Sequence, residues 1–318
     1  MKACLSRSLS GVALVWCAVL GWAQPYGYVS NAMSNTVSVV NRANNAVAAS
    51  ILIGGAGLSG LAITPDGSRL YVAGESKNNV SVISTASHLV TSTIGVGSRP
   101  IQVAITPDGA FAYVVNQSSN SVSVIYIPSN TLIATIPVGS RPAGIAITPD
   151  GTKALVTNMY SSSISVISTA WNAVIETWRA LSGAEGIAIS PNGSLVYVAN
   201  QYANAVTVHS AASGGILATV GGLAAPNAIA VAPNGSQVYV TNGNAARLSV
   251  INAYSNTVTA NVGVGMLPTS VAVSADGTKA YVTNAYGYSL SIIDTAANSV
   301  CDTIARVGIY PVAAVLYR

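Results

Sequence analysis

One stretch of this sequence recurs at a fixed spacing. The segment A-I-T-P-D-G-x-x-x-Y-V-x-N occupies residues 104–116, and its Pro-Asp-Gly or Pro-Asn-Gly centre returns along the chain. The acidic or amide residue of that centre is found at Asp66, Asp108, Asp150, Asn192 and Asn234, and at Asp276 after an Ala in place of the Pro. Successive copies are 42 residues apart. A constant period of this length indicates an array of equivalent supersecondary units.

Each unit contains four short segments that we expect to be strands. In one unit these are residues 101–105, the Y-V-x-N segment 113–116, the alternating S-V-S-V-I segment 121–125, and residues 132–138. Short runs rich in Val, Ile, Thr and Tyr, bounded by Gly, Pro and Asn, are typical of strands. The Asp-Gly or Asn-Gly pair between the first two segments favours a tight hairpin, because Gly tolerates a positive φ. We expect each Asp or Asn side chain to cap its own turn.

Four antiparallel strands in 42 residues match one blade of a β-propeller. First strands are expected near residues 60, 102, 144, 186, 228, 270 and 312, and second strands near 28, 71, 113, 155, 197, 239 and 281. We therefore predict an all-β fold, a seven-bladed β-propeller of four-stranded antiparallel blades. The C-terminal strand, Pro311 to Tyr317, should complete the N-terminal blade and so close the ring without an open edge.

The repeat resembles that of the YVTN-family β-propellers, which include surface-layer proteins and many secreted proteins. The resemblance rests on A-I-T-P-D-G-x-x-x-Y-V-T-N followed by S-V-S-V-I, and it extends over residues 25–318. It implies a propeller fold, a location outside the cytoplasm, and ligand binding on the face that carries the loops after each Y-V-x-N segment. It assigns no particular chemistry.

The first residues have the pattern of a secretory signal peptide. Lys2 and Arg7 form a positive segment, residues 11–20 are apolar, and Gly21-Trp22-Ala23 resembles a cleavage site. We expect a signal peptide at 1–23 and a single propeller domain at 24–318. The expected location is secreted, periplasmic or at the cell surface.

Composition limits the classes of partner. The chain is 51% hydrophobic and 7% charged, but after residue 25 it has no apolar run long enough to cross a membrane. Without a Lys/Arg cluster, the formal net charge of +4 does not indicate nucleic-acid binding. Cys301 is the single cysteine after the signal peptide, and we expect it to be a small buried hydrophobic residue in a strand.

The sequence shows no catalytic or metal-binding motif. His88 and His209 belong to different units, and one Asp per blade cannot supply the six to eight oxygens that calcium takes. We therefore predict no metal, no cofactor and no catalytic residues. The repeated Asn of the Y-V-x-N segment is expected to satisfy backbone groups at the strand end; it occurs at Asn31, Asn116, Asn158, Asn200, Asn242 and Asn284.

The informative positions are those at which the repeat is broken. Six residues in the expected upper loops carry charge or an aromatic ring where sister copies differ: Arg99, Arg141, Glu185, Glu75, Tyr160 and Tyr202. Two guanidinium groups, carboxylates and tyrosines in neighbouring loops could form a site for an anionic or sugar-like ligand. The alternative is that they are separate, solvated side chains on a loop face.

These observations favour an exported, monomeric, non-catalytic propeller that acts as a binding scaffold for an envelope or extracellular protein or glycan. Two alternatives stay open. One is an exported enzyme of the lactonase or lyase kind, which would need two or more carboxylates or histidines at the mouth of the channel. The other is a structural surface-layer component, which would associate with itself and bind no small ligand.

Overall fold

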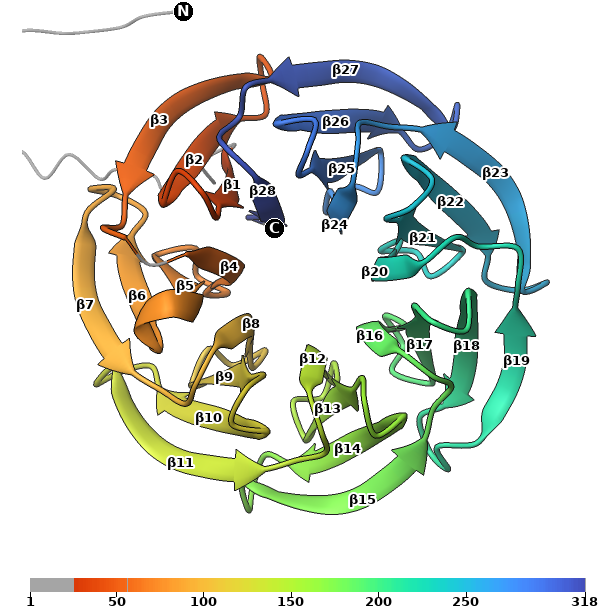
Figure 1. Ribbon diagram of the computed structural model, residues 1–318, viewed down its shortest axis with the longest axis horizontal. Coiled ribbons are helices and arrows are strands. Elements are labelled where there is room, and N and C mark those ends of the chain that lie inside the picture. The colour runs from red at the N-terminus through yellow and green to blue at the C-terminus, as the bar shows by residue number, and fades with distance from the viewer. Residues whose placement is uncertain (1–25, 56, 318) are drawn as a thin grey trace, which may run out of the picture.

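A computed structural model describes residues 26–55 and 57–317 of the chain. In these residues, 28 strands form seven four-stranded antiparallel sheets arranged as a ring around a central axis (Figure 1). The predicted seven-bladed propeller is therefore confirmed. The predicted signal peptide, residues 1–23, lies outside the described residues. None of the described residues belongs to a helix with the length and apolar character needed to cross a membrane.

In six of the blades the four strands follow one another outward from the axis in chain order, whereas in the remaining blade the innermost strand is the last strand of the described chain. The innermost strands are β28 (Pro311–Leu316), β4 (Leu58–Ile63), β8 (Pro100–Ile105), β12 (Pro142–Ile147), β16 (Ala184–Ile189), β20 (Pro226–Val231) and β24 (Pro268–Val273). The second strands are β1 (Tyr26–Asn31), β5 (Arg69–Gly74), β9 (Phe111–Asn116), β13 (Lys153–Asn158), β17 (Leu195–Asn200), β21 (Gln237–Asn242) and β25 (Lys279–Asn284). The third strands are β2 (Thr36–Asn41), β6 (Asn79–Ser84), β10 (Ser121–Tyr126), β14 (Ser163–Ser168), β18 (Ala205–Ser210), β22 (Arg247–Asn252) and β26 (Ser289–Asp294). The outer strands are β3 (Ala46–Leu52), β7 (Val90–Gly95), β11 (Thr131–Pro137), β15 (Ala173–Arg179), β19 (Ile216–Val220), β23 (Thr257–Gly263) and β27 (Ser299–Ala305).

Blade 1 is built from both ends of the described chain. Strand β28 pairs antiparallel with β1, with Gly27 opposite Leu316 and Val29 opposite Ala314. The sheet order is β28-β1-β2-β3, so the last strand supplies the innermost position of the first blade. We number the blades from this one, so that blade 2 contains β4–β7 and blade 7 contains β24–β27. The ring closes through main-chain hydrogen bonds, as the sequence predicted.

The hydrophobic core is divided among the contacts between blades. Seven buried clusters each contain residues of two neighbouring blades, for example Leu155 and Val166 of blade 4 with Ile187 and Val198 of blade 5. Each face of a blade is therefore covered by the blade that lies next to it in the ring. This arrangement explains why the short strands are apolar on both sides and why so few charges occur in the sequence.

Buried tyrosines of the second strands form hydrogen bonds between blades. The Tyr71 hydroxyl donates to Asn130 Oδ1 at 2.6 Å, and Tyr113 donates to Asn172 Oδ1 at 2.8 Å. In each pair the acceptor belongs to the following blade. A buried hydroxyl with a partner avoids the cost of an unsatisfied polar group. The repeated tyrosine thus combines a large apolar contact with a specific link to the neighbouring blade.

The repeated Asp and Asn cap their own turns, as predicted. Thr106 Oγ1 donates to Asp108 Oδ1 at 2.5 Å, and the Ala110 amide donates to the same oxygen at 2.9 Å. The Thr106 hydroxyl, followed by the Ala110 amide, lowers the pKa of Asp108 from its usual value of 3.8. Asn192 forms the equivalent bonds with Ser190 and Ser194 in blade 5.

We expect Asp108→Ala to lower the free energy of unfolding at neutral pH by about 1 to 2 kcal/mol, because two turn hydrogen bonds lose their acceptor. Asp108→Asn is the control, since Asn already serves in blades 5 and 6. The pKa of Asp108 is lower in the folded chain, so its charge-dependent contribution exists above the unfolded value and disappears as the pH falls through the folded value. Urea unfolding at pH 7 and pH 3 measures both effects. Equal losses for Ala and Asn would contradict the capping role.

The repeated Asn residues have different partners from those expected. Each is buried, and its Nδ2 donates mainly to a Ser or Thr hydroxyl seven residues later on the third strand, as from Asn116 to Ser123 Oγ at 2.9 Å. Backbone carbonyls are additional acceptors for Asn31, Asn200 and Asn242. The alternating Ser or Thr of the third strand therefore pairs with the Asn of the second, which explains why the two motifs recur together.

The prediction that Cys301 is buried was wrong. It does lie in a strand, but the side chain is exposed because β27 is an outer strand with a single buried position, Ile304. Cys301 Sγ lies 3.5 Å from Lys279 Nζ and donates to the Ile292 carbonyl at 3.4 Å. The expectation of burial failed because the outer strand of a blade has no neighbouring strand on one side.

Candidate functional site

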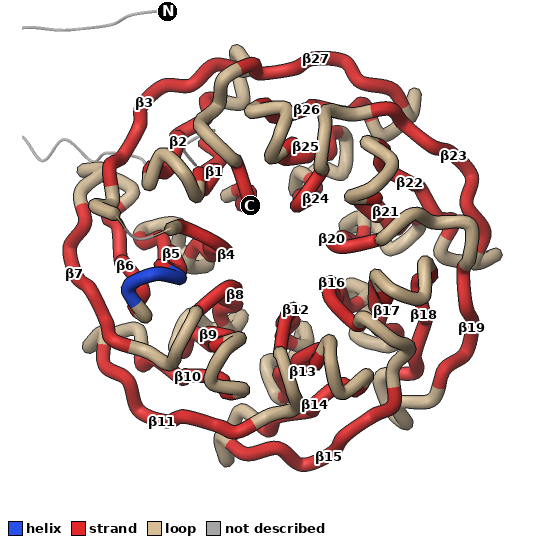
Figure 2. Tube along the Cα trace, viewed as in Figure 1, coloured by secondary structure: helices blue, strands red, loops and turns tan. Residues whose placement is uncertain are grey.

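Two sets of loops lie on the same face of the ring, which we call the upper face. Strand order and antiparallel pairing place the loops from second to third strands beside the loops that lead into the next first strand. Backbone bonds join the two sets in each blade, as from Gln117 N to Arg99 O at 2.9 Å and from Met159 N to Arg141 O at 3.0 Å. The single helical turn of the described residues, η1 (Glu75–Lys77), also lies among these loops (Figure 2).

Arg99 and Arg141 occupy equivalent, conformationally unusual positions. Both have positive φ, 55° and 50°, just before the Pro that opens an innermost strand. Their amides donate to an Asn side chain 21 residues earlier, Asn78 for Arg99 at 2.9 Å and Asn120 for Arg141 at 2.8 Å. The backbone that carries each guanidinium is therefore held firmly. Left-handed backbone is unfavourable for a non-Gly residue and is tolerated where the surroundings fix it.

The six candidate residues separate into two groups. The first group is Arg99 and Glu75, whose side chains form an exposed ion pair with Nε and Oε2 3.1 Å apart. An exposed pair of this kind contributes little to stability. Both side chains remain at the surface of the upper face at blades 2 and 3.

The second group lies at blades 4 and 5 and contains Arg141, Tyr160, Glu185 and Tyr202. The Arg141 guanidinium bonds to the Tyr160 hydroxyl, and its central carbon lies 4.6 Å from the centroid of the tyrosine ring. The Tyr202 ring lies against Gly183, and its hydroxyl reaches Met159 Sδ at 3.9 Å. The structure thus brings four of the six residues together, and we call them the blade 4/5 cluster.

Glu185 has the most unusual environment of the cluster. It is the second residue of the innermost strand β16, and it is the only ionisable side chain in the seven innermost strands. Burial raises the pKa of Glu185 to about 7, while the positive charge of Arg141 acts in the opposite direction. Its Oε2 atom is buried and has no hydrogen-bond partner among the described residues. Desolvation of a carboxyl without a hydrogen-bond partner lowers the stability of the fold. Residues with strongly shifted pKa values are found more often at functional sites.

Other blades place neutral residues at the position of Glu185. They are Ser59, Ile101, Ala143, Asn227, Thr269 and Val312. Two of these donate to the carbonyl of the Pro that begins the next innermost strand: Asn227 Nδ2 to Pro268 O at 2.8 Å, and Thr269 Oγ1 to Pro311 O at 3.1 Å. In the other six blades this position therefore holds an apolar side chain or a neutral hydrogen-bonding one, and an ionised carboxylate is neither.

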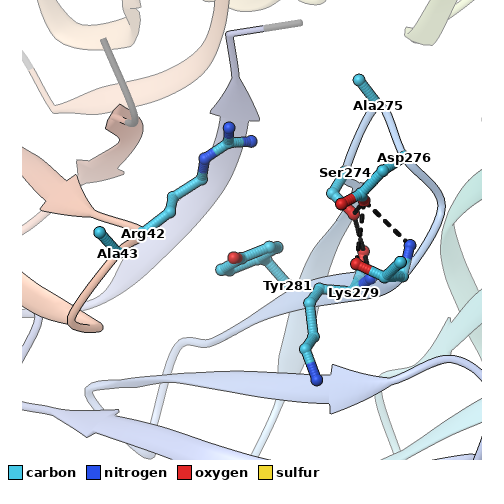
Figure 3. A pocket seen from close by; sticks show the side chains of 8 residues that line it. Arg42, Ala43, Ser274, Ala275, Asp276, Lys279 and Tyr281 are labelled. Atoms are coloured by element: carbon cyan, nitrogen blue, oxygen red, sulfur yellow. Dashed lines mark hydrogen bonds between the residues drawn. The ribbon is translucent and has the colours of Figure 1, made fainter.

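A recess of about 430 Å³ opens on the opposite, lower face between blades 7 and 1 (Figure 3). Strands β28 and β1 of blade 1 come from opposite ends of the described chain, so no hairpin turn joins them. Its lining includes Arg42, Asp276, Lys279 and Tyr281. Lys279 Nζ is paired with Asp294 at 2.8 Å, and Asp276 accepts bonds from its own turn. Lys279 and Asp276 therefore serve the structure, whereas Arg42 has a buried Nε without a partner but no second unpaired group beside it among the described residues. We place the candidate site at the blade 4/5 cluster, where Arg141 and Glu185 both have unpaired polar atoms.

The histidines and carboxylates outside this cluster are dispersed. His209 is fully buried and bonded to Gly214 O and Thr207 Oγ1, and His88 lies in the turn after β6. Within residues 26–55 and 57–317, no three His, Cys, Asp or Glu side chains gather in a way that could hold a metal ion.

Comparison with known proteins supports the fold. A family model described as "Lactonase, 7-bladed beta-propeller" matches residues 21–135 and 54–170, an overlapping region that ends in blade 4. No curated protein matches the chain. A functionally unknown protein from Desulfotomaculum acetoxidans is a similar solved structure, with a TM-score of 0.81 and 21% identity over 92% of this chain and 98% of that one. A putative 6-phosphogluconolactonase from Bacteroides uniformis has a TM-score of 0.78 and 16% identity over 92% and 99%.

Proposed function

We propose that this protein is an exported, non-catalytic propeller that binds its partner through the upper face, with the blade 4/5 cluster as the centre of recognition. The single observation that carries the proposal is Glu185, a half-buried carboxyl whose Oε2 atom is buried without a partner among the described residues and whose pKa responds to the charge of Arg141. A rigid ring with variable loops suits recognition, because the loops are held in place before a ligand arrives. The signal-like segment at 1–23 supports export.

The test is capture of partners from envelope and medium fractions on the purified, immobilised protein. Two double variants run beside it: Arg141→Ala/Glu185→Ala removes the blade 4/5 charges, and Arg99→Ala/Glu75→Ala removes the exposed ion pair. We expect the first variant to lose the retained partner and the second to keep it. Both should fold, since Ala225 already occupies the position of the arginines with positive φ. Retention by the first variant would exclude the cluster as the centre of recognition.

A second candidate function is an exported hydrolase of the lactonase kind. The family-model match and the Bacteroides uniformis structure favour it. Acid–base chemistry of this kind needs a positioned group within hydrogen-bond reach of the substrate, and Glu185 is the innermost-strand residue that could act. Hydrolysis of a sugar lactone that is lost in Glu185→Gln would favour this function over the non-catalytic one.

A further inference from the structure

The blade 4/5 cluster presents two aromatic rings from neighbouring blades. Tyr160 and Tyr202 occupy equivalent positions, each two residues after the repeated Asn, and are 60% and 56% exposed. Arg141 holds Tyr160 by its hydroxyl, and Tyr202 is held between Gly183 and Met159. An exposed aromatic ring that is already held in one position offers apolar contact area at a small entropic cost. Two such rings suit a ligand that has at least two flat apolar faces.

The polar groups of the cluster offer both a donor and an acceptor. Arg141 donates from Nη1 to Tyr160; its Nε is buried without a partner, and its Nη2 is neither bonded nor buried among the described residues. Glu185 has no hydrogen bond to either oxygen; Oε2 is buried, whereas Oε1 is not. Arginine only donates, and an ionised carboxylate only accepts. The open capacity of the cluster is therefore one cationic donor and one anionic acceptor.

Charge balance selects the ligand class. A carboxylate or phosphate would suit Arg141 but face Glu185, and an ammonium group would suit Glu185 but face Arg141. A hydroxyl can accept from one and donate to the other without adding charge. Extending the proposed function, on which this step rests, we propose that the cluster binds an uncharged oligosaccharide, with hydroxyls bonded to Arg141 and Glu185 and sugar rings packed on Tyr160 and Tyr202.

The ionisation of Glu185 determines whether sugar affinity rises or falls with pH. The charged group that faces Glu185 is Arg141, from the loop before β12; the other titratable side chains of the cluster are Tyr160 and Tyr202, from the loops after β13 and β17. Ionised Glu185 accepts the stronger, charge-assisted hydrogen bond from a sugar hydroxyl. With a pKa of about 7, the carboxyl is ionised in about a tenth of molecules at pH 6 and about nine tenths at pH 8. Affinity for a neutral sugar should therefore rise with pH, by up to about tenfold. An acidic sugar would show the opposite sign.

The experiment is calorimetric titration at pH 6 and pH 8 with maltohexaose, cellohexaose, chitohexaose and a galacturonate hexamer. We expect one neutral hexaose to bind more tightly at pH 8, and the Glu185→Gln variant to show the same affinity at both pH values. Tyr160→Ala and Tyr202→Ala should each weaken binding at least tenfold. Tyr254→Ala is the matched control, because Tyr254 is 80% exposed in a turn on the lower face. The melting temperatures of all variants check that they fold.

Four outcomes overturn the proposal. Preferential binding of the galacturonate hexamer would make the ligand anionic, and pH-independent binding of a neutral hexaose would remove Glu185 from the site. Binding of none of the four hexamers, with partner capture still dependent on Arg141 and Glu185, would leave the proposed function standing with a protein as the partner. Loss of both sugar binding and partner capture would reject the proposed function as well.

Discussion

A chain that ends at Tyr310 should lose most of its stability, because strand β28 is the innermost strand of blade 1. Its removal would expose the edge of β1 and break the pairing of Gly27 with Leu316 and of Val29 with Ala314. It would also uncover the cores that β28 shares with its neighbours. Burial of each large apolar side chain contributes about 1.5 to 3 kcal/mol, and whole domains are stable by only about 5 to 15 kcal/mol. Loss of several such contacts together should therefore remove the cooperative thermal transition.

Circular dichroism during heating, together with limited proteolysis, measures this effect. A chain that ends at Tyr317 is the control, since it keeps the whole of β28. Leu316→Ala is an intermediate case, expected to cost about 2 to 5 kcal/mol as a large-to-small change at a buried position. A Tyr310-ended chain that melts within a few degrees of the full protein would show that the ring does not depend on its closing strand.

The architecture could be predicted because it repeats. A hairpin signal every 42 residues, with strand-like segments at fixed offsets from it, defines blade number, strand order and closure without knowledge of any long-range contact. The same repetition made the role of Asp108 predictable, because a turn cap depends on residues within a few positions of it. Cys301 was different: its exposure depends on which strand of the blade has no further neighbour.

The site was only partly predictable for the same reason. Breaks in the repeat identified Arg141, Glu185, Tyr160 and Tyr202, which the structure brings together. Their separation from Arg99 depends on side-chain conformations that spacing does not specify. The burial of Glu185 had a signal in the sequence: comparing the second residue of every innermost strand reveals one ionisable side chain among seven.

Glu185 should make the protein less stable at alkaline than at acidic pH. Burial raises its pKa from the usual 4.5 to about 7 in the folded chain, so the folded state holds a proton that the unfolded chain releases. Well below pH 4.5 the carboxyl is protonated in both states, so its charge contributes no penalty. Between pH 4.5 and 7 stability falls by about 1.4 kcal/mol per pH unit, and above pH 7 the penalty stays constant at up to about 3 kcal/mol. Glu185→Gln cannot ionise and should escape this penalty.

Urea unfolding of the protein and of Glu185→Gln at pH 4.5, 6, 7 and 8 isolates the effect, because other titrating groups cancel in the difference. We expect the variant to match the protein at pH 4.5 and to be more stable by up to about 3 kcal/mol at pH 8. Glu176→Gln, on the outer strand β15, controls for loss of a carboxylate, since the amide oxygen of Gln can still accept the bond that Trp178 Nε1 donates to Glu176 Oε2. A difference that stays constant with pH would mean that the folded chain does not desolvate Glu185. A difference that grows as expected would mean that ionised Glu185 destabilises the fold at neutral and alkaline pH. The six other blades have neutral side chains at this position and avoid that penalty. Binding would then be the better explanation for the presence of Glu185.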